Sequence, residues 1–217
     1  MSESHPRSIV HHDIDHILTT TRTVRRRLDL DRAVDRRLVE ECVDLALQAP
    51  SGANRQDWRF IAIDEPATKG AVAHIYRESF LQHYGTAQAP SQAGARLGDA
   101  VAGSARHLAD NLHRVPVIVV PYRLASAPDT RAAQASFWAS ILPAAWSFML
   151  AARSRGLVTA YTARGLDREQ DLAAALGLAH PSVTQAGLIA VAFPDKQDFR
   201  PAKREPLSTV LRWNVDG

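Results

Sequence analysis

Three short stretches of the sequence hold more polar side chains than packing against a core requires. The first, Arg22-Thr23-Val24-Arg25, places two guanidinium groups three residues apart with a hydroxyl group between them. At the mouth of a helix or turn, both arginines can close on one anion, and a phosphate dianion is bound by such converging charge-assisted donors. A solvated basic surface is the alternative that this stretch alone leaves open.

The second stretch, residues 49–58 (APSGANRQDW), joins an amphipathic run to an apolar one. Ser51 and Asn54 offer hydrogen-bond donors and acceptors to a planar heterocycle. Gly52 and Ala53 allow such a ring to approach the backbone closely. The residue types therefore indicate a loop built around a flat ligand.

Two further residues of that loop, Gln56 and Trp58, are expected to anchor it to the core. The third stretch, residues 201–207 (PAKREPL), adds the basic pair Lys203 and Arg204 after the last predicted strand. Two basic clusters so far apart in the sequence suggest one phosphate contacted from both ends of the chain.

The elements that position these residues are predicted from hydrophobic periodicity and from breakers. Helices are expected over residues 13–20, 35–49, 67–84 and 132–155, the last interrupted by Pro143, and a capping box of Asp167 and Gln170 is expected to start a helix that ends at Gly177. Strands are expected over residues 59–63, 115–122, 157–162 and 185–193. Residues 85–104 are rich in Gly, Ala, Ser and Gln, which favours a mobile irregular segment and a candidate lid. Without a strict strand–helix alternation, the pattern favours an α+β fold.

Length and composition set the domain organisation. The chain has 217 residues, of which 46% are apolar and 23% charged, as in ordinary globular proteins. We expect a flexible N-terminal tail over residues 1–12 and a single domain over residues 13–217. No run of 18 apolar residues occurs, and the first residues lack the apolar core of a signal peptide, so we expect no membrane span and a cytoplasmic location.

Composition also restricts the ligands. Cys42 is the only cysteine, which excludes internal disulfides and multi-cysteine metal sites, and its spacing predicts a buried thiol. His12 and His16 lie four residues apart without a further ligand in sight, so we expect solvated histidines and no metal. The net charge is +3 and comes mostly from arginine, but acidic residues are interspersed, which argues against nucleic-acid binding.

The chain resembles the FMN-dependent nitroreductase superfamily, which includes the iodotyrosine deiodinases. The resemblance covers nearly all of residues 13–212. It rests on four motifs in order: RTVR at 22–25, APSGANRQDW at 49–58, LAARSRGLVTAYT at 150–162 and KREPL at 203–207.

The resemblance implies a three-layer sandwich, with a central, mostly antiparallel sheet flanked by helices, and a domain-entwined homodimer with FMN at the interface. Carried over by position, the FMN phosphate would be held by Arg22, Thr23, Arg25, Lys203 and Arg204. The flavin ring would be bordered by Pro50, Ser51 and Asn54, and its N5 atom by Tyr161, Thr162 and Ala163. The substrate side would include Ala53, Glu78 and Trp138.

By the same resemblance, no amino acid side chain acts as the catalytic group, since flavin N5 carries the hydride. The expected activity is NAD(P)H oxidation coupled by a ping-pong, two-electron mechanism to nitroaromatic, quinone or similar planar acceptors. A reductive dehalogenase, a flavin-binding protein without turnover, and a nucleic-acid-binding protein are the alternatives. The deiodinase pattern of Glu, Tyr and Lys is incomplete here, because Gln82 stands four residues after Glu78 and no lysine occurs in residues 85–120.

Overall fold

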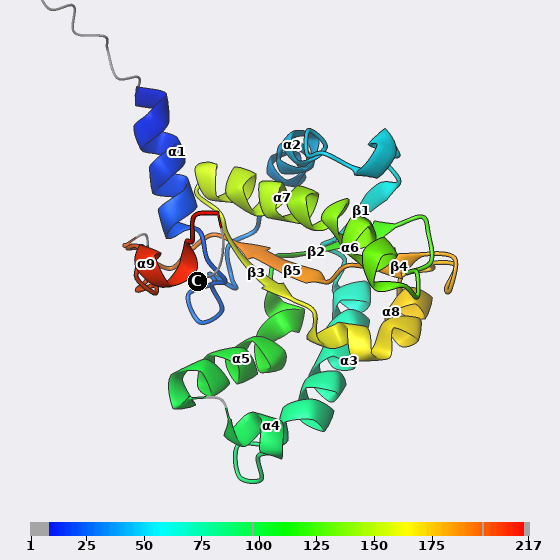
Figure 1. Cartoon of the computed structure of the whole chain (residues 1–217). Coiled ribbons are helices and arrows are strands. Elements are labelled where there is room, and N and C mark those ends of the chain that lie inside the picture. Colours follow the sequence, from blue (N-terminus) through cyan, green and yellow to red (C-terminus); the bar gives the residue numbers. More distant parts are fainter. Residues whose placement is uncertain (1–8, 97, 197, 215–217) are drawn as a thin grey trace, which may run out of the picture.

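The middle layer of the molecule is an antiparallel sheet (Figure 1). The computed structural model describes residues 9–96, 98–196 and 198–214. Its sheet has the strand order β1-β2-β5-β3, with β4 paired to β2. The strands are β1 (Trp58–Ile63), β2 (Val117–Arg123), β3 (Val158–Thr162), β4 (Thr184–Gln185) and β5 (Leu188–Ala192). In this order β1 and β3 form opposite edges of the sheet.

Side chains alternate between the two faces of the central strands, and each face is covered by helices. Val117 and Val119 of β2 pack in one cluster with residues of α2 (Arg36–Ala46) and α7 (Leu142–Ser154). The intervening Ile118 and Val120 pack in the other cluster. That cluster includes residues of α3 (Pro66–Tyr84) and α5 (Asp99–Asn111). Figure 1 shows the two helix layers above and below the sheet, so the predicted three-layer α+β sandwich is confirmed.

The remaining elements are short or lie at the ends of the chain. The helices are α1 (Ile9–Thr20), α4 (Gln92–Ala95), α6 (Arg131–Ala139), α8 (Glu169–Ala175) and α9 (Leu207–Val210). The tight 3-10 turns are η1 (Gly52–Asn54), η2 (Leu112–Arg114) and η3 (Arg164–Arg168). Because α1 begins at Ile9, four residues of the predicted tail are helical, and the rest of that tail lies outside the described residues.

The long apolar segment predicted over 132–155 forms two helices, as Pro143 indicates. It divides at Ser140 and Ile141, and Pro143 lies in the first turn of α7, where a missing N–H breaks no helical hydrogen bond. By length and composition alone Arg131–Ser154 is apolar enough to cross a membrane, but half of it is buried inside this fold. Its buried half supplies the core on the α7 side of the sheet.

Four local predictions need correction. The helix predicted to 49 already ends at Ala46, although Asp35 caps its start as expected by accepting a hydrogen bond from Arg37 N at 2.9 Å. The predicted capping box is wrong. Asp167 lies within η3, and its carboxylate accepts a hydrogen bond from Arg164 Nη1 at 2.5 Å.

The last two corrections concern residues 85–104 and 185–193. From Asp99 onward the predicted irregular segment is helix α5, which buries Leu108 and Ala109 against the core. The predicted strand divides at Gly187, whose φ is 145°. A Cβ atom there would lie 2.9 Å from the Thr162 carbonyl oxygen, so glycine lets the start of β5 approach the end of β3.

The buried thiol of Cys42 gives a direct test of the α2–α7 packing. Burial raises the pKa of Cys42 to about 11, so at pH 8 only about one thiol in a thousand is ionised. We expect native protein not to react with an aromatic disulfide reagent at pH 8, whereas protein unfolded in guanidinium releases one thiol per chain. Rapid stoichiometric reaction of the native protein would contradict this packing.

Candidate functional site

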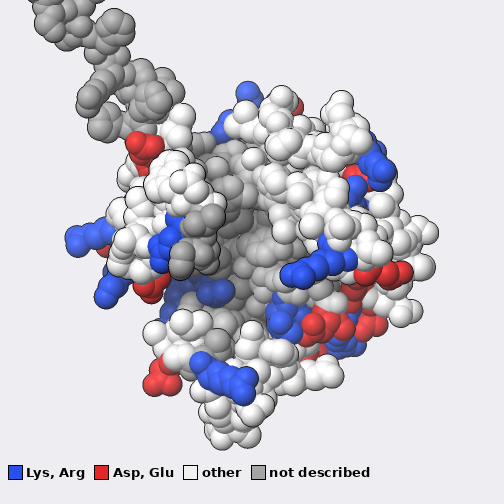
Figure 2. All heavy atoms as spheres, viewed as in Figure 1, with Lys and Arg blue, Asp and Glu red and all other residues white. Residues whose placement is uncertain are grey.

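A cleft of about 640 Å³ lies between residues 22–27 and residues 198–201, and Ser104 of α5 also lines it. The three sequence-predicted phosphate ligands of the N-terminal segment, Arg22, Thr23 and Arg25, all line it. The three predicted ligands of the first polar stretch therefore lie together in one cleft. On the face shown in Figure 2, basic and acidic side chains are otherwise interspersed rather than gathered in one basic stripe.

Backbone pairing holds this arginine segment at the edge of the sheet. Thr23 forms a parallel bridge with Thr159 of β3, and Val24 N donates to the Thr159 carbonyl at 2.8 Å. Further along, Asp29 N donates to the Phe193 carbonyl at 2.8 Å, beyond the end of β5. Val24 is buried at the floor of this segment, and Thr23 and Arg25 on either side of it line the cleft with it.

The charges in the cleft are only partly compensated. Arg27 is neutralised by Asp198 at 2.5 Å and by Asp195 at 3.4 Å. By contrast, Nε and Nη2 of Arg22 are buried and have no hydrogen-bond partner among the described residues. The Nε atom of Arg153, from the last turn of α7 and behind the residues that line the cleft, is also buried without a partner among the described residues. Burial and the nearness of Arg22 lower the pKa of Arg153.

These orphaned donors fit an anion. Buried polar groups are normally hydrogen-bonded, and leaving a charged one unpaired is costly. A phosphate-sized anion between neighbouring guanidinium groups would accept hydrogen bonds from their free N–H atoms and would also neutralise their charge.

The predicted C-terminal phosphate ligands lie elsewhere in the single chain. Lys203 and Arg204 are exposed, Arg204 Nη1 donates to the Lys203 carbonyl at 3.3 Å, and neither residue lines the cleft. Arg200 lines the cleft from the same tail. The role assigned to Lys203 and Arg204 stays a prediction.

The loop at 50–57 has an unusual backbone. Ala53, Asn54 and Gln56 have φ values of 52°, 53° and 50°, in the left-handed region that non-glycine residues rarely adopt. Each such residue costs about 1–3 kcal/mol and persists only where surrounding contacts enforce it. Non-glycine strain of this kind is typical of binding sites, which agrees with the predicted role of the loop.

Contacts to α6 and the buried residue at the end of the loop hold its strained backbone in place. Gly52 N donates to Ser140 Oγ at 2.9 Å, and Gly52 and Ala53 line a hollow of about 330 Å³ together with residues of α6. Trp58 is buried against Ile141, which confirms it as an anchor. Pro50, Ala53 and Asn54 are exposed and Ser51 is half-buried.

The predicted second anchor is wrong. Gln56 is exposed, and its side-chain amide donates to Asn54 Oδ1 at 2.8 Å rather than to the core. Asp57 takes this role instead. Its carboxylate accepts hydrogen bonds from Arg123 Nε at 2.8 Å and from Arg123 Nη2 at 2.6 Å. The Arg123 guanidinium also donates to the Phe137 carbonyl at 2.8 Å and lies 4.2 Å from the centroid of the Phe137 ring.

The residues predicted beside flavin N5 lie at the end of β3. The Tyr161 hydroxyl donates to the Ala186 carbonyl, and burial raises the pKa of Tyr161. Thr162 Oγ1 accepts a hydrogen bond from Arg164 N at 3.3 Å, and Ala163 is exposed. This strand end is therefore fixed by its own neighbours and presents Ala163 outward.

The predicted substrate-side residues do not form one cluster. Ala53 lies in the loop, and Trp138 on α6 is half-buried with its ring edge-to-face to Phe137 at 5.0 Å. Glu78 is exposed on α3. Only Ala53 lines the hollow between the loop and α6.

The loop and the arginine cleft belong to different edges of the sheet. The loop leads into β1, whereas the arginine segment pairs with β3 (Figure 1). Three strand spacings separate those edges, roughly 14 Å. The two groups of residues line separate cavities in one chain.

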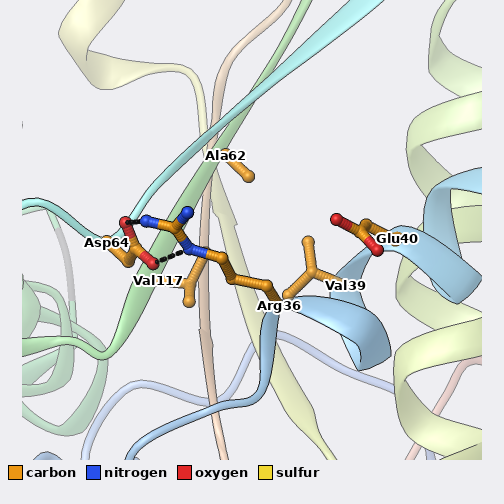
Figure 3. A pocket seen from close by; sticks show the side chains of 6 residues that line it. All are labelled: Arg36, Val39, Glu40, Ala62, Asp64 and Val117. Atoms are coloured by element: carbon orange, nitrogen blue, oxygen red, sulfur yellow. Dashed lines mark hydrogen bonds and ion pairs between the residues drawn. The ribbon is translucent and has the colours of Figure 1, made fainter.

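A further hollow of about 250 Å³ lies between α2 and the strands β1 and β2 (Figure 3). Arg36 bridges it to Asp64, with Nε–Oδ2 and Nη2–Oδ1 distances of 2.6 and 2.8 Å. This pairing raises the pKa of Arg36 and lowers that of Asp64, so both stay charged and mutually satisfied. The charged groups in this hollow therefore form a surface ion pair and not a reaction centre.

The predicted absence of a metal site meets no contrary observation in the described part of the chain, which holds no group of three or more His, Cys, Asp or Glu residues suited to a metal. His16 is exposed, and the side chain of His12 lies outside the described residues.

A family model for the Nitroreductase family matches residues 18–193. The chain belongs to the nitroreductase family. A protein named NADH dehydrogenase from Thermus thermophilus is 31% identical over 189 residues, covering 81% of this chain and 84% of that protein. The resemblance predicted from the four motifs is confirmed, and the family makes this chain an oxidoreductase.

Solved structures share the fold. An iodotyrosine deiodinase bound to FMN and 3-iodo-L-tyrosine superposes with a TM-score of 0.72 at 19% identity, covering 94% of this chain and 100% of that one. An FMN- and NADPH-dependent nitroreductase from sphigopyxis sp. strain HMH gives a TM-score of 0.67 at 19% identity, covering 94% and 99%. These likenesses confirm the nitroreductase-like fold.

Arg123 and Arg153 were not identified from the sequence. The available signal for Arg123 was its position directly after the apolar run VPVIVVPY, where an arginine at the end of a buried strand needs a partner. The signal for Arg153 was its place in the apolar run SFMLAARSR, directly after Ala152, which is fully buried.

The Asp57–Arg123 pair predicts a large effect for a small change. Asp57→Asn should destabilise the protein by about 3 kcal/mol, because it leaves the Arg123 guanidinium, whose side chain is only 4% exposed, without its carboxylate. Asp110→Asn is the matched control, since its 3.2 Å pair with Arg77 is exposed and should contribute less than about 1 kcal/mol. Urea unfolding measures both.

The same variant has a defined pH dependence. Hydrogen bonds from Arg123 lower the pKa of Asp57 below its unfolded value, so this stabilisation is present above about pH 4. It is lost as the pH falls below that value and through the lowered folded pKa. The stability difference between wild type and Asp57→Asn should therefore shrink in acid, and a difference that stays constant down to about pH 2 would contradict the assignment.

Proposed function

We propose that this chain is an FMN-dependent oxidoreductase. It takes electrons from NAD(P)H and reduces nitroaromatic, quinone or similar planar acceptors by a ping-pong, two-electron mechanism. The observation on which this rests most is the pair of buried, unpartnered guanidinium nitrogens of Arg22 in the cleft beside β3. Family membership supports the cofactor and the donor.

The described residues fit the phosphate of FMN. Arg22 and Arg25 supply cationic donors and Thr23 a hydroxyl, all from one extended segment that the sheet edge holds in place. Arg200 adds a cation from the tail. Bound FMN supplies the hydride-accepting and hydride-donating chemistry, and the protein binds, orients and shields it.

The remaining predicted contacts border the ring. Ser51 and Asn54 offer polar groups to its pyrimidine edge from a loop whose backbone is already fixed, so little order is lost on binding. Thr162 and Ala163 border the reacting edge from the end of β3, where Ala163 presents a small side chain and leaves room for a flat acceptor. Ala53 and Trp138 are assigned to the acceptor side.

A homodimer would bring the loop at 50–57 and the arginine cleft together. In one chain the loop and the cleft lie at opposite sheet edges, so the loop of a second copy completes the cleft of the first. Large apolar side chains support such an interface: Leu142 and Trp146 on α7 are 40% and 41% exposed, and Trp213 in the tail is 80% exposed. Exposed apolar residues on several elements mark interaction surfaces. A cytoplasmic location and the absence of membrane and nucleic-acid partners remain predictions of the sequence.

Reductive dehalogenation is not favoured by a contact in this structure. Glu78 and Gln82, which occupy the deiodinase zwitterion positions by sequence, are both exposed on α3. The planar-acceptor activity is therefore the better-supported proposal.

Purified wild-type protein is expected to show visible flavin absorption and to oxidise NADH or NADPH when a nitrobenzene or benzoquinone is added. Arg22→Ala with Arg25→Ala should purify folded but colourless, because two lost charge-assisted contacts weaken FMN binding by roughly a hundredfold or more. Arg36→Ala with Arg37→Ala is the matched control, since it removes two exposed arginines outside the cleft. A fully yellow cleft variant would refute the phosphate assignment, and a colourless wild type would refute the function.

Light scattering at micromolar concentration should give twice the 23.8 kDa mass of one chain. A stable interface of this kind buries at least about 2,000 Å² in total. Trp146→Glu should shift the population toward monomer and release FMN, whereas Val101→Glu, at an exposed position on α5, should not. A monomer that retains FMN would contradict the shared site.

A further inference from the structure

Arg153 occupies a position that its helix does not explain. It lies in the last turn of α7, where its Nη2 atom is 3.4 Å from Thr20 Oγ1 and its guanidinium carbon is 4.7 Å from the centroid of the Phe199 ring. Its Nε atom is buried without a partner among the described residues. The charged neighbour that affects its titration is Arg22, another cation.

Arg155, two residues further on, shows what an arginine at this helix end does when it is only structural. Its Nε atom donates to the Glu41 carboxylate at 3.0 Å, and its Nη1 atom donates to the Ala151 carbonyl at 3.3 Å. Both a carboxylate and a helix carbonyl are therefore within reach of this helix end. Arg153 has no carboxylate partner in the described chain; it packs instead on Phe199, which lines the cleft together with Arg22.

We propose that Arg153 is a further ligand of the anion that Arg22 binds, contacting it from α7 while Arg22 contacts it from the N-terminal segment. The identity of that anion as the phosphate of FMN rests on the function proposed above. Neither the sequence motifs nor the family match assigns Arg153 to the site.

The donors suit a phosphate group in number and in sign. Three buried guanidinium nitrogens lack acceptors among the described residues, namely Nε and Nη2 of Arg22 and Nε of Arg153. A phosphate group offers several anionic oxygens, and one placed between two guanidinium groups replaces their repulsion with two attractions. The same anion would satisfy all three orphaned atoms.

Phe199 keeps Arg153 in place before a ligand arrives. Its ring lies 4.7 Å from the Arg153 guanidinium and 4.5 Å from that of Arg27, so two cations share one aromatic side chain. Arg27 is already neutralised by Asp198, which leaves Arg153 as the cation of the pair that still lacks a counter-charge in the described chain. A preorganised donor of this kind raises affinity because little side-chain freedom is lost on binding.

The proposal predicts selectivity for the phosphate group rather than for the ring. FMN and riboflavin share the isoalloxazine ring, and only FMN has the phosphate. Loss of Arg153 should therefore weaken FMN binding and leave riboflavin binding unchanged.

The test uses the full chain freed of flavin and titrated separately with FMN and riboflavin, with quenching of flavin fluorescence as the readout. Arg153→Met keeps a long apolar stem over Phe199 and removes the charge. It should weaken FMN binding about 10- to 100-fold and change riboflavin binding less than about twofold. Arg153→Lys should fall between wild type and Arg153→Met, because it restores the charge without the planar fork.

Arg155→Met is the matched control on the same helix end. It removes the Glu41 contact and should leave the affinities for both flavins within about twofold of wild type. Thermal unfolding of each flavin-free variant checks that it is folded. If Arg153→Met keeps wild-type FMN affinity, or weakens FMN and riboflavin equally, the proposal is overturned.

Two further outcomes separate this proposal from the proposed function. If wild type binds neither flavin, the function fails, and inorganic phosphate then tests Arg153 alone. A rise in the wild-type melting temperature with phosphate that Arg153→Met lacks supports the anion site, and equal rises overturn it. If Arg153→Met alters the dimer mass but not the ratio of FMN to riboflavin affinity, a carboxylate of a second copy pairs with Arg153 and the proposal is overturned.

Discussion

The backbone hydrogen bond from Val24 N to the Thr159 carbonyl attaches the arginine segment to the edge of the sheet, and the rest of the candidate site depends on it. Four arginines within six residues repel one another and would not gather unaided. Strand pairing and the burial of Val24 and Leu28 supply the favourable free energy that holds them together. Apolar packing of neighbouring residues therefore offsets the repulsion between the positive charges that line the cleft.

The layers of the fold could be predicted because they follow from local patterns. Alternation along residues 117–120 assigns neighbouring side chains to opposite faces, and each face is covered as that alternation requires. The errors arise where a contact in the folded chain outweighs the local sequence pattern. Asp167 bonds to Arg164 and Ser79 rather than capping a helix, and Gly187 divides a strand because β3 approaches closely.

The candidate site could be predicted where its residues are neighbours in the sequence. Arg22, Thr23 and Arg25 are close together in the sequence, so one element brings all three to the cleft. Arg153 lies within the motif at 150–162, but it is 131 positions from Arg22 in the sequence, and only the fold brings the two charges near each other. Asp57 and Arg123 likewise meet only because β1 and β2 pair in the register that aligns Trp58 with Arg123.

The left-handed backbone at Ala53, Asn54 and Gln56 also shapes the unfolded chain. Glycine would adopt these φ values without strain, but it would give the unfolded loop many more conformations to lose on folding. The non-glycine residues at these positions reduce the number of conformations of the unfolded loop, and the cost is backbone strain in the folded loop. The loop therefore has a shape fixed by the sequence before any ligand arrives, and its conformational entropy contributes little to the free energy of binding.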